Sequence, residues 1–134
     1  MTIALRVVLG LIGLAVLALG LNTGLGGIQT LGWRGPTDFV SSLNEIDYAV
    51  QDNNIRFFAG FFFAGGLVFL AGAVRLEQMA VPLITICCMI AVGGFFRLSG
   101  EQAGVALSNG AMASVVLEFT LFPLIAFFVY RSTR

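Results

Sequence analysis

Three charged side chains interrupt long apolar stretches of this sequence at positions where they could do chemistry: Arg56, Arg97 and Glu118. Arg56 stands in the stretch NNIRFFAGFFFAGG (residues 53–66), and Arg97 stands in the nearly reversed string VGGFFRLSG (92–100). Glu118 is the one charge in the stretch VVLEFTLFPL. A guanidinium offers planar, bidentate donors suited to a carboxylate, phosphate or sulfo group. The three residues therefore indicate an ion-pair cluster or an anion-binding site.

The reversal of the two arginine strings has a geometric meaning. If they belong to consecutive antiparallel helices in a membrane, a string and its reverse place Arg56 and Arg97 at one depth. Glu118 lies about five residues inside its own apolar stretch, roughly 7 to 8 Å deep, which an arginine side chain can reach. An ionisable group at membrane depth is costly unless it is paired, so we expect the arginines to be its partners. Three polar neighbours are expected to join this cluster: Asn54, Ser99 and Ser114.

Small residues lie at helical spacing from both arginines, after Arg56 and before Arg97. In membrane helices, small residues mark contacts between helices because they let the two backbones approach closely. Four positions are predicted to pack in this way: Gly60, Ala64, Gly93 and Gly94. Both arginines would then face the interior or the seam of a helix bundle.

Apolar helices must position these charges, because the chain is 58% hydrophobic and only 10% charged, against about 25% charged in soluble domains. Four long apolar segments cover residues 3–21, 55–74, 81–96 and 113–130. Segments of about 16 to 20 residues extend roughly 24 to 30 Å as helices, which matches the hydrocarbon core of a bilayer. The sequence therefore predicts an all-α integral membrane four-helix bundle that forms a single transmembrane domain over residues 1–134.

The long first connection is predicted to contain an amphipathic helix over residues 37–51. Its apolar stripe recurs at steps of four, three and four, and consists of Phe39, Leu43, Ile46 and Val50. Thr37 can cap its start, and Ser42 with Glu45 offers an alternative capping box. Because this segment lacks Lys and Arg, we expect it to pack over the bundle and not to bind anionic lipid.

The arginines also predict how the protein is oriented. An even number of spans puts both termini on one side, together with Arg6, Arg75, Arg131 and Arg134. If Arg56 and Arg97 belong to the site, only Arg34 remains opposite. This charge bias places both termini in the cytoplasm.

Composition excludes several kinds of chemistry. All seven Lys and Arg residues are arginines and there is no His, so a lysine Schiff base and most haem, copper or di-iron sites are not expected. Cys87 and Cys88 are neighbours in an apolar run, a spacing that suits neither a disulfide nor a redox pair. The formal net charge is zero, which gives no reason to expect a nucleic-acid partner. We therefore expect no catalytic residue, cofactor or metal ion. Whether the protein is an enzyme stays open, with a non-enzymatic role favoured.

Several short strings resemble a family of small bacterial membrane proteins known as domain of unknown function 4345: NNIRFFAG, VRLEQ, GGFFRLSG and LEFTLFPL. The resemblance implies a four-helix protein of the bacterial inner membrane and implies no activity. By its motifs it draws attention to residues already singled out, among them Asn54, Arg56, Arg97, Ser99 and Glu118. A looser likeness to DoxX-type four-helix proteins is an analogy of fold.

Three functions stay open on this sequence. The first is a non-enzymatic membrane module whose Arg56/Arg97/Glu118 cluster pins the bundle and binds a lipid-like anion. The second is an accessory subunit of a larger membrane complex, of which a redox complex is one candidate. The third is a small proton-coupled transporter that uses Glu118, although two nearby arginines would hold this carboxylate ionised. The expected partners are membrane lipids, other membrane subunits or further copies of this chain.

Overall fold

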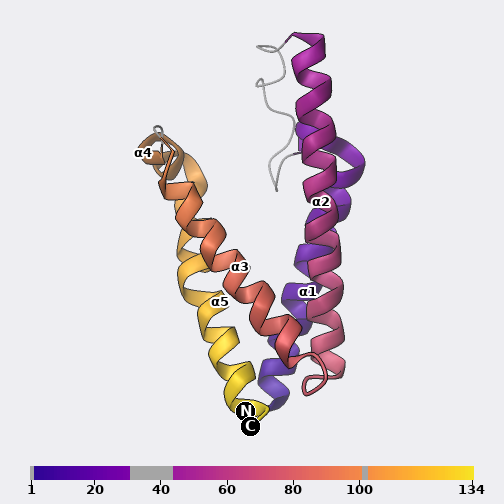
Figure 1. Cartoon of the computed structure of the whole chain (residues 1–134), viewed down its shortest axis with the longest axis vertical. Coiled ribbons are helices and arrows are strands. Elements are labelled where there is room, and N and C mark those ends of the chain that lie inside the picture. The colour runs from indigo at the N-terminus through magenta and orange to yellow at the C-terminus, as the bar shows by residue number, and fades with distance from the viewer. Residues whose placement is uncertain (1, 31–43, 101–102) are drawn as a thin grey trace. The chain divides into compact units, whose positions relative to one another are not determined.

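The structure is a computed structural model that describes residues 2–30, 44–100 and 103–134. Its elements are α1 (Thr2–Gly26), the short 3-10 helix η1 (Gly27–Thr30), α2 (Glu45–Val74), α3 (Ala80–Leu98), α4 (Ala103–Ala106), the π-helical turn η3 (Leu107–Ala111) and α5 (Met112–Ser132) (Figure 1). Within these described ranges, every regular element is a helix.

In the part of the chain that the structure describes, four helical segments are long and apolar enough to cross a membrane: Ile3–Thr30, Glu45–Val74, Ala80–Leu98 and Met112–Ser132. The shortest of them has 19 residues. At 1.5 Å per residue, this segment extends about 28 Å, close to the thickness of a hydrocarbon core. The predicted all-α, four-helix membrane fold is confirmed, and the chain is a multi-pass membrane protein.

The helices fall into two compact units. Unit 1 comprises Met1–Val7 with Gly72–Arg134, and unit 2 comprises Val8–Ala71. The long helices α1 and α2 contribute to both units, whereas α3, α4 and α5 belong to unit 1. The expectation of one domain over residues 1–134 stays a prediction.

The second helix begins well before the predicted apolar span, at Glu45 instead of Ile55. Asn44 caps it: its Oδ1 accepts the N–H of Asp47 at 2.9 Å, and its side-chain amide donates to the Asp47 carboxylate. No glycine or proline separates this start from the apolar run, so the helix continues without a break. Of the helix predicted over residues 37–51, the part from Glu45 belongs to α2, and the part up to residue 43 lies outside the described residues.

In unit 2, α1 and α2 pack closely through glycines. A Cβ built on Gly66 would lie 2.6 Å from the backbone nitrogen of Leu17 and 2.7 Å from its Cβ. Real side chains essentially never approach so closely, so only a glycine allows this backbone separation. Two further contacts of this kind pair Gly13 with Leu70 and Gly20 with Phe63.

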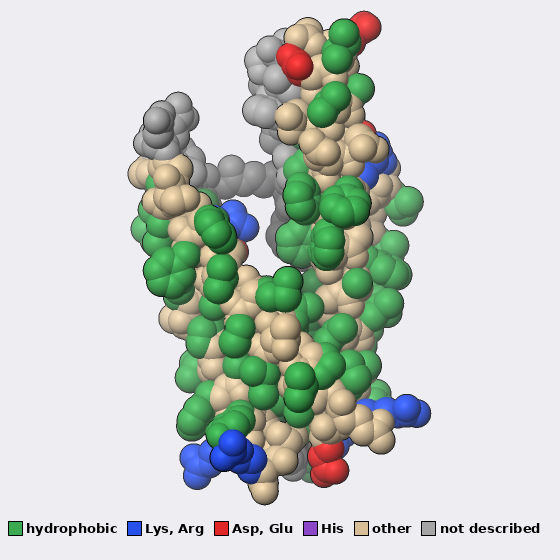
Figure 2. All heavy atoms as spheres, in the orientation of Figure 1, with side chains coloured by type: hydrophobic (Ala, Val, Ile, Leu, Met, Phe, Trp, Pro, Cys, Tyr) green, Lys and Arg blue, Asp and Glu red, His purple; other side chains and the backbone are tan. Residues whose placement is uncertain are grey.

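In unit 1, α3 packs along α5 (Figure 1). The side chains that the unit buries on these two helices are apolar: Leu83, Cys87, Val115, Ile125 and Val129. Much of the remaining surface of the two helices is also apolar (Figure 2). In water such a surface would be unfavourable, whereas in a bilayer it faces lipid tails.

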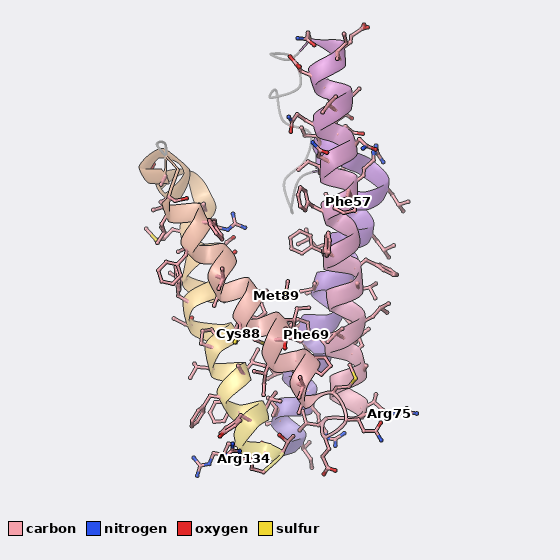
Figure 3. All side chains as sticks on the ribbon, in the orientation of Figure 1. Phe57, Phe69, Arg75, Cys88, Met89 and Arg134 are labelled. Carbon is pink, nitrogen blue, oxygen red and sulfur yellow. The ribbon has the colours of Figure 1, made fainter. Side chains whose placement is uncertain are left out.

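An arginine caps the C-terminal end of α2 within unit 1. Nη1 of Arg6 donates to the carbonyls of Ala73 at 3.1 Å and Val74 at 2.6 Å. These carbonyls have no partner within their own helix, and a cation there also opposes the helix dipole. Arg75 and Arg134 lie at the same end of the unit (Figure 3). That end therefore gathers basic side chains.

Candidate functional site

The strongest candidate site in unit 1 is an ion pair between the last turn of α3 and the second turn of α5. Nε of Arg97 donates to both carboxylate oxygens of Glu118, at 2.9 Å to Oε1 and 3.1 Å to Oε2. The Arg97 side chain is 50% exposed and the Glu118 side chain 13%. The carboxylate is therefore held against the protein, while the guanidinium extends outward.

A glycine on α3 makes the room that Glu118 occupies. A Cβ built on Gly94 would lie 3.1 Å from Oε2 and 3.2 Å from Cβ of Glu118, and 3.3 Å from the ring of Phe119. These separations are tighter than nine in ten real contacts of a Cβ atom. Beside this glycine, the rings of Phe95 and Phe119 meet edge to face, with centroids 5.0 Å apart. The contact between α3 and α5 therefore positions the Glu118 carboxylate beside Arg97.

Within the described part of the chain, Arg97 uses only one of its guanidinium donors. A guanidinium has five N–H donors, and only the one on Nε is used by Glu118. Among the described residues, neither terminal nitrogen of Arg97 has a hydrogen-bond acceptor. The two terminal nitrogens form the fork that binds carboxylates and phosphates in bidentate fashion.

Arg56 has a different environment, inside unit 2. Its Nε donates to Oδ2 of Asp52 at 2.6 Å, one turn earlier on α2. Its Nη1 donates to the carbonyls of Gly24 at 3.0 Å and Leu25 at 2.8 Å, in the last turn of α1. Arg56 therefore caps α1 and neutralises the negative end of that helix.

Asp52 completes this cap. Its Oδ1 accepts the N–H of Ile28 at 2.8 Å, just after α1 has ended. Gly27, which lies between the end of α1 and Ile28, has φ +68°. A Cβ added to it would collide with the carboxylate of Asp52 and lie 2.7 Å from Nη2 of Arg56. Glycine is required here both for the left-handed backbone and for space. The Asp52–Arg56 pair thus joins α1 to α2.

The structure brings Arg97 and Glu118 together and gives Arg56 its own carboxylate within unit 2. The three-residue cluster with Arg56 stays a prediction. The sequence interpretation missed Asp52, although Asp and Arg four residues apart on a helix are the usual signal for an ion pair. The pair Gly26–Gly27 also follows an apolar run, as a helix C-terminus does.

The predicted polar neighbours lie on separate elements. Ser99 follows the end of α3, where its N–H and its hydroxyl both donate to the carbonyl of Phe96, at 3.3 and 2.9 Å. Ser114 is half-buried one turn before Glu118 on α5, and Asn54 is exposed on α2.

Of the four small residues expected to pack, Gly94 is buried against α5. The other three are exposed: Gly60, Ala64 and Gly93. A Cβ built on Gly60 or Gly93 would meet no atom within 4 Å, so neither glycine lies at a close helix contact in its own unit. The close contacts of unit 2 fall on glycines that the sequence interpretation had not selected.

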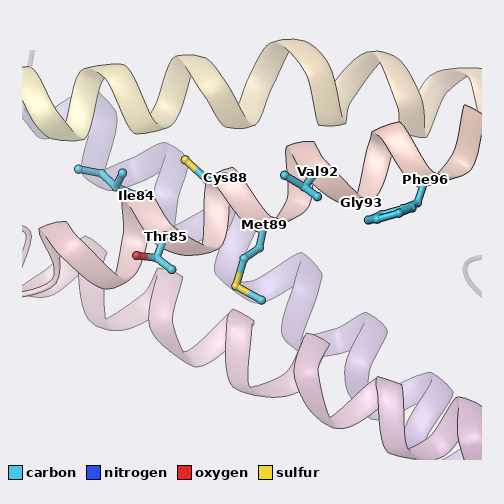
Figure 4. A pocket seen from close by; sticks show the side chains of 7 residues that line it. All are labelled: Ile84, Thr85, Cys88, Met89, Val92, Gly93 and Phe96. Carbon is cyan, nitrogen blue, oxygen red and sulfur yellow. The ribbon is translucent and has the colours of Figure 1, made fainter.

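A shallow apolar groove of about 550 Å³ runs along α3 (Figure 4). Its lining side chains all come from this helix: Ile84, Thr85, Cys88, Met89, Val92, Gly93 and Phe96. Cys88 is exposed there, whereas its neighbour Cys87 is buried. Within residues 2–30, 44–100 and 103–134, no three Cys, Asp or Glu side chains gather as metal ligands would.

The fold and the site define a class: a small multi-pass helical membrane protein with an arginine–glutamate pair joining two of its helices. The sequence pattern of the family described as Domain of unknown function (DUF4345) matches residues 4–129, and the chain belongs to this family. This membership confirms the resemblance seen in the motifs. Among curated proteins and solved structures, no match to the chain is found. The looser likeness to DoxX-type proteins stays a prediction.

Proposed function

We propose that this protein is a non-enzymatic module of the bacterial inner membrane that binds a lipid-like anion at Arg97. The observation that carries the proposal is that only one of the three guanidinium nitrogens of Arg97 is hydrogen-bonded within the described residues. Glu118 occupies Nε alone, while the terminal fork has no acceptor among the described residues. An arginine that is held through Nε and whose terminal nitrogens have no acceptor in the described ranges is suited to bind a phosphate or carboxylate from outside the protein.

The ion pair has two roles in this proposal. An unpaired carboxylate at membrane depth would be costly, so Glu118 on α5 keeps Arg97 on α3 as its partner, and the pair joins the two helices. It also orders the arginine side chain in advance, so that less rotamer entropy is lost when an anion binds. Arg56 contributes differently: its Nε and Nη1 are both hydrogen-bonded, and these bonds pin α1 to α2.

The proposed orientation places the Arg97 end of α3 on the periplasmic side. Four arginines of unit 1 lie near the chain ends or in the α2–α3 turn: Arg6, Arg75, Arg131 and Arg134. Basic residues accumulate on the cytoplasmic side of membrane proteins, so this end and both termini are assigned to the cytoplasm. The anion would then come from the outer leaflet of the inner membrane.

Thermal unfolding in detergent tests the proposal. Phosphatidylglycerol should raise the melting temperature of the wild type more than phosphatidylcholine, since a ligand at 100 times its Kd adds about 2.7 kcal/mol to the unfolding free energy. Arg97→Gln should remove most of this difference. The matched control is Arg75→Gln, an exposed arginine at the other end of α3, which should keep it. Equal responses of the wild type and Arg97→Gln would refute an anion site at Arg97.

A second candidate function is an accessory subunit of a larger membrane complex. Exposed aromatic rings on α2 support it, because Phe57, Phe58 and Phe61 contact one another on the surface, with Phe57 and Phe61 centroids 5.3 Å apart. Aromatic side chains supply large contact areas at protein interfaces. Purification from native membranes in a gentle detergent would distinguish the two candidates: a stoichiometric partner chain favours the subunit, and a lone chain excludes it.

A further inference from the structure

We propose that the ligand is an anionic phospholipid, with one acyl chain lying in the groove along α3 and its phosphate on the terminal nitrogens of Arg97. This inference rests on the proposed function and names its ligand and the path of the tail. The acyl chain would lie on groove residues that do not include Arg97 or Glu118. The two parts can therefore be tested separately.

The groove and the arginine are continuous on α3. Thr85, Met89 and Gly93 line the groove at intervals of four residues, and Arg97 is the next residue at this interval. Residues four apart lie one above another on a helix face. An acyl chain that follows this row toward the C-terminal end of α3 therefore reaches the guanidinium one turn beyond Gly93.

The shape of the groove suits an acyl chain. Its lining is almost entirely apolar, and at Gly93 the missing side chain leaves open space, since an added Cβ would meet no atom within 4 Å. Met89 and Phe96 stand on either side of this gap along the helix and are both exposed. An open, apolar trough can accept a flexible hydrocarbon chain without requiring any polar contact.

The length of the groove matches one leaflet. From Ile84 to Phe96 the helix rises about 18 Å. One leaflet contributes half of a hydrocarbon core of about 30 Å. A lipid of the leaflet at the Arg97 end would thus fill the groove with its tail while its phosphate stays at the arginine. This depth relation favours a bilayer lipid over a second copy of the chain, which would also have to bring an acid to Arg97.

Filling the groove should weaken binding without disturbing the arginine. Gly93→Phe places a ring in the open space, and Gly60→Phe is the matched control, because Gly60 on α2 is also exposed with no atom within 4 Å of an added Cβ. In native mass spectrometry with phosphatidylglycerol titrated into detergent, Gly93→Phe and Arg97→Gln should each raise the Kd about tenfold. Gly60→Phe should bind as the wild type does.

Cys88 reports directly on the groove. It is exposed in the lining, and buried Cys87 is its internal reference. Phosphatidylglycerol should slow the alkylation of Cys88 by N-ethylmaleimide several-fold in the wild type and not in Arg97→Gln, whereas phosphatidylcholine should protect weakly in both.

The outcomes separate the two proposals. If Arg97→Gln loses the lipid while Gly93→Phe keeps it and Cys88 stays unprotected, the groove assignment is wrong and the anion site stands. If Arg97→Gln binds phosphatidylglycerol as tightly as the wild type, both are wrong. Equal affinity for phosphatidylcholine would overturn the anionic headgroup, and protection of Cys88 by dimer formation without added lipid would assign the groove to a second copy of the chain.

Discussion

Replacing Gly66 by alanine should separate α1 from α2 and destabilise unit 2. A Cβ there would lie 2.6 Å from the backbone nitrogen of Leu17 and 2.8 Å from its Cα, whereas ordinary contact begins at 3.4 Å. The obstacle is backbone, so the helices must move apart by about 0.8 Å or bend. Overpacking of this kind costs about 1–3 kcal/mol. Gly60→Ala on the same helix meets no atom within 4 Å and should be neutral or stabilising by up to about 1 kcal/mol through helix propensity.

Pulse proteolysis in mixed micelles of dodecyl maltoside and SDS measures this difference, because the folded chain survives a brief exposure to protease and the unfolded chain is cleaved. Both variants share any gain in helix propensity, so their unfolding free energies should differ by the overpacking cost of about 1–3 kcal/mol. Two variants of equal stability would show that the helices do not meet closely at Gly66.

Three further changes test the ion pairs and the helix cap. Glu118→Gln should lower stability by about 1 kcal/mol, and the double variant with Arg97→Gln should lose less than the sum of the single variants; additive losses in the same proteolysis assay would contradict the pairing. Asp52→Ala should speed amide hydrogen exchange at Ile28 about tenfold, because the N–H of Ile28 loses its acceptor; an unchanged exchange rate would place that acceptor elsewhere. Gly27→Ala should destabilise by at least about 1 kcal/mol at φ +68°, and a neutral effect would refute the left-handed conformation.

The spans and one ion pair could be predicted because they follow from local physics. Apolar segments long enough to cross a bilayer can satisfy their backbone only as helices, so composition and length determine the fold class. Glu118 needed a partner at its own depth, and Arg97 stands at the end of the preceding apolar segment. The pair at 2.9 Å in unit 1 agrees with this depth argument.

The start of α2 and the choice of packing glycines could not be predicted from hydropathy and membrane depth alone. Hydropathy marks where a helix enters lipid and not where it begins, so the polar first turns of α2, capped by Asn44, were read as a separate element. The expected glycine contacts were placed on the helix faces of the arginines, whereas the close α1–α2 contacts of unit 2 fall on Gly13, Gly20 and Gly66. Which glycine of many meets a backbone is decided by the rotation of each helix, and a single apolar sequence leaves that rotation open.

The most direct test of the central claim is the proximity of a lipid phosphate to Arg97. In bilayers containing phosphatidylglycerol, protein labelled with ¹³C at the arginine guanidinium carbons can be measured by ¹³C–³¹P dipolar recoupling in solid-state NMR. We predict a short-range guanidinium–phosphorus contact in the wild type, consistent with N–H···O distances of about 2.8 Å. This contact should disappear in Arg97→Gln and persist in Arg75→Gln. A dephasing signal that is unchanged in Arg97→Gln, or that is lost in Arg75→Gln instead, would contradict the account.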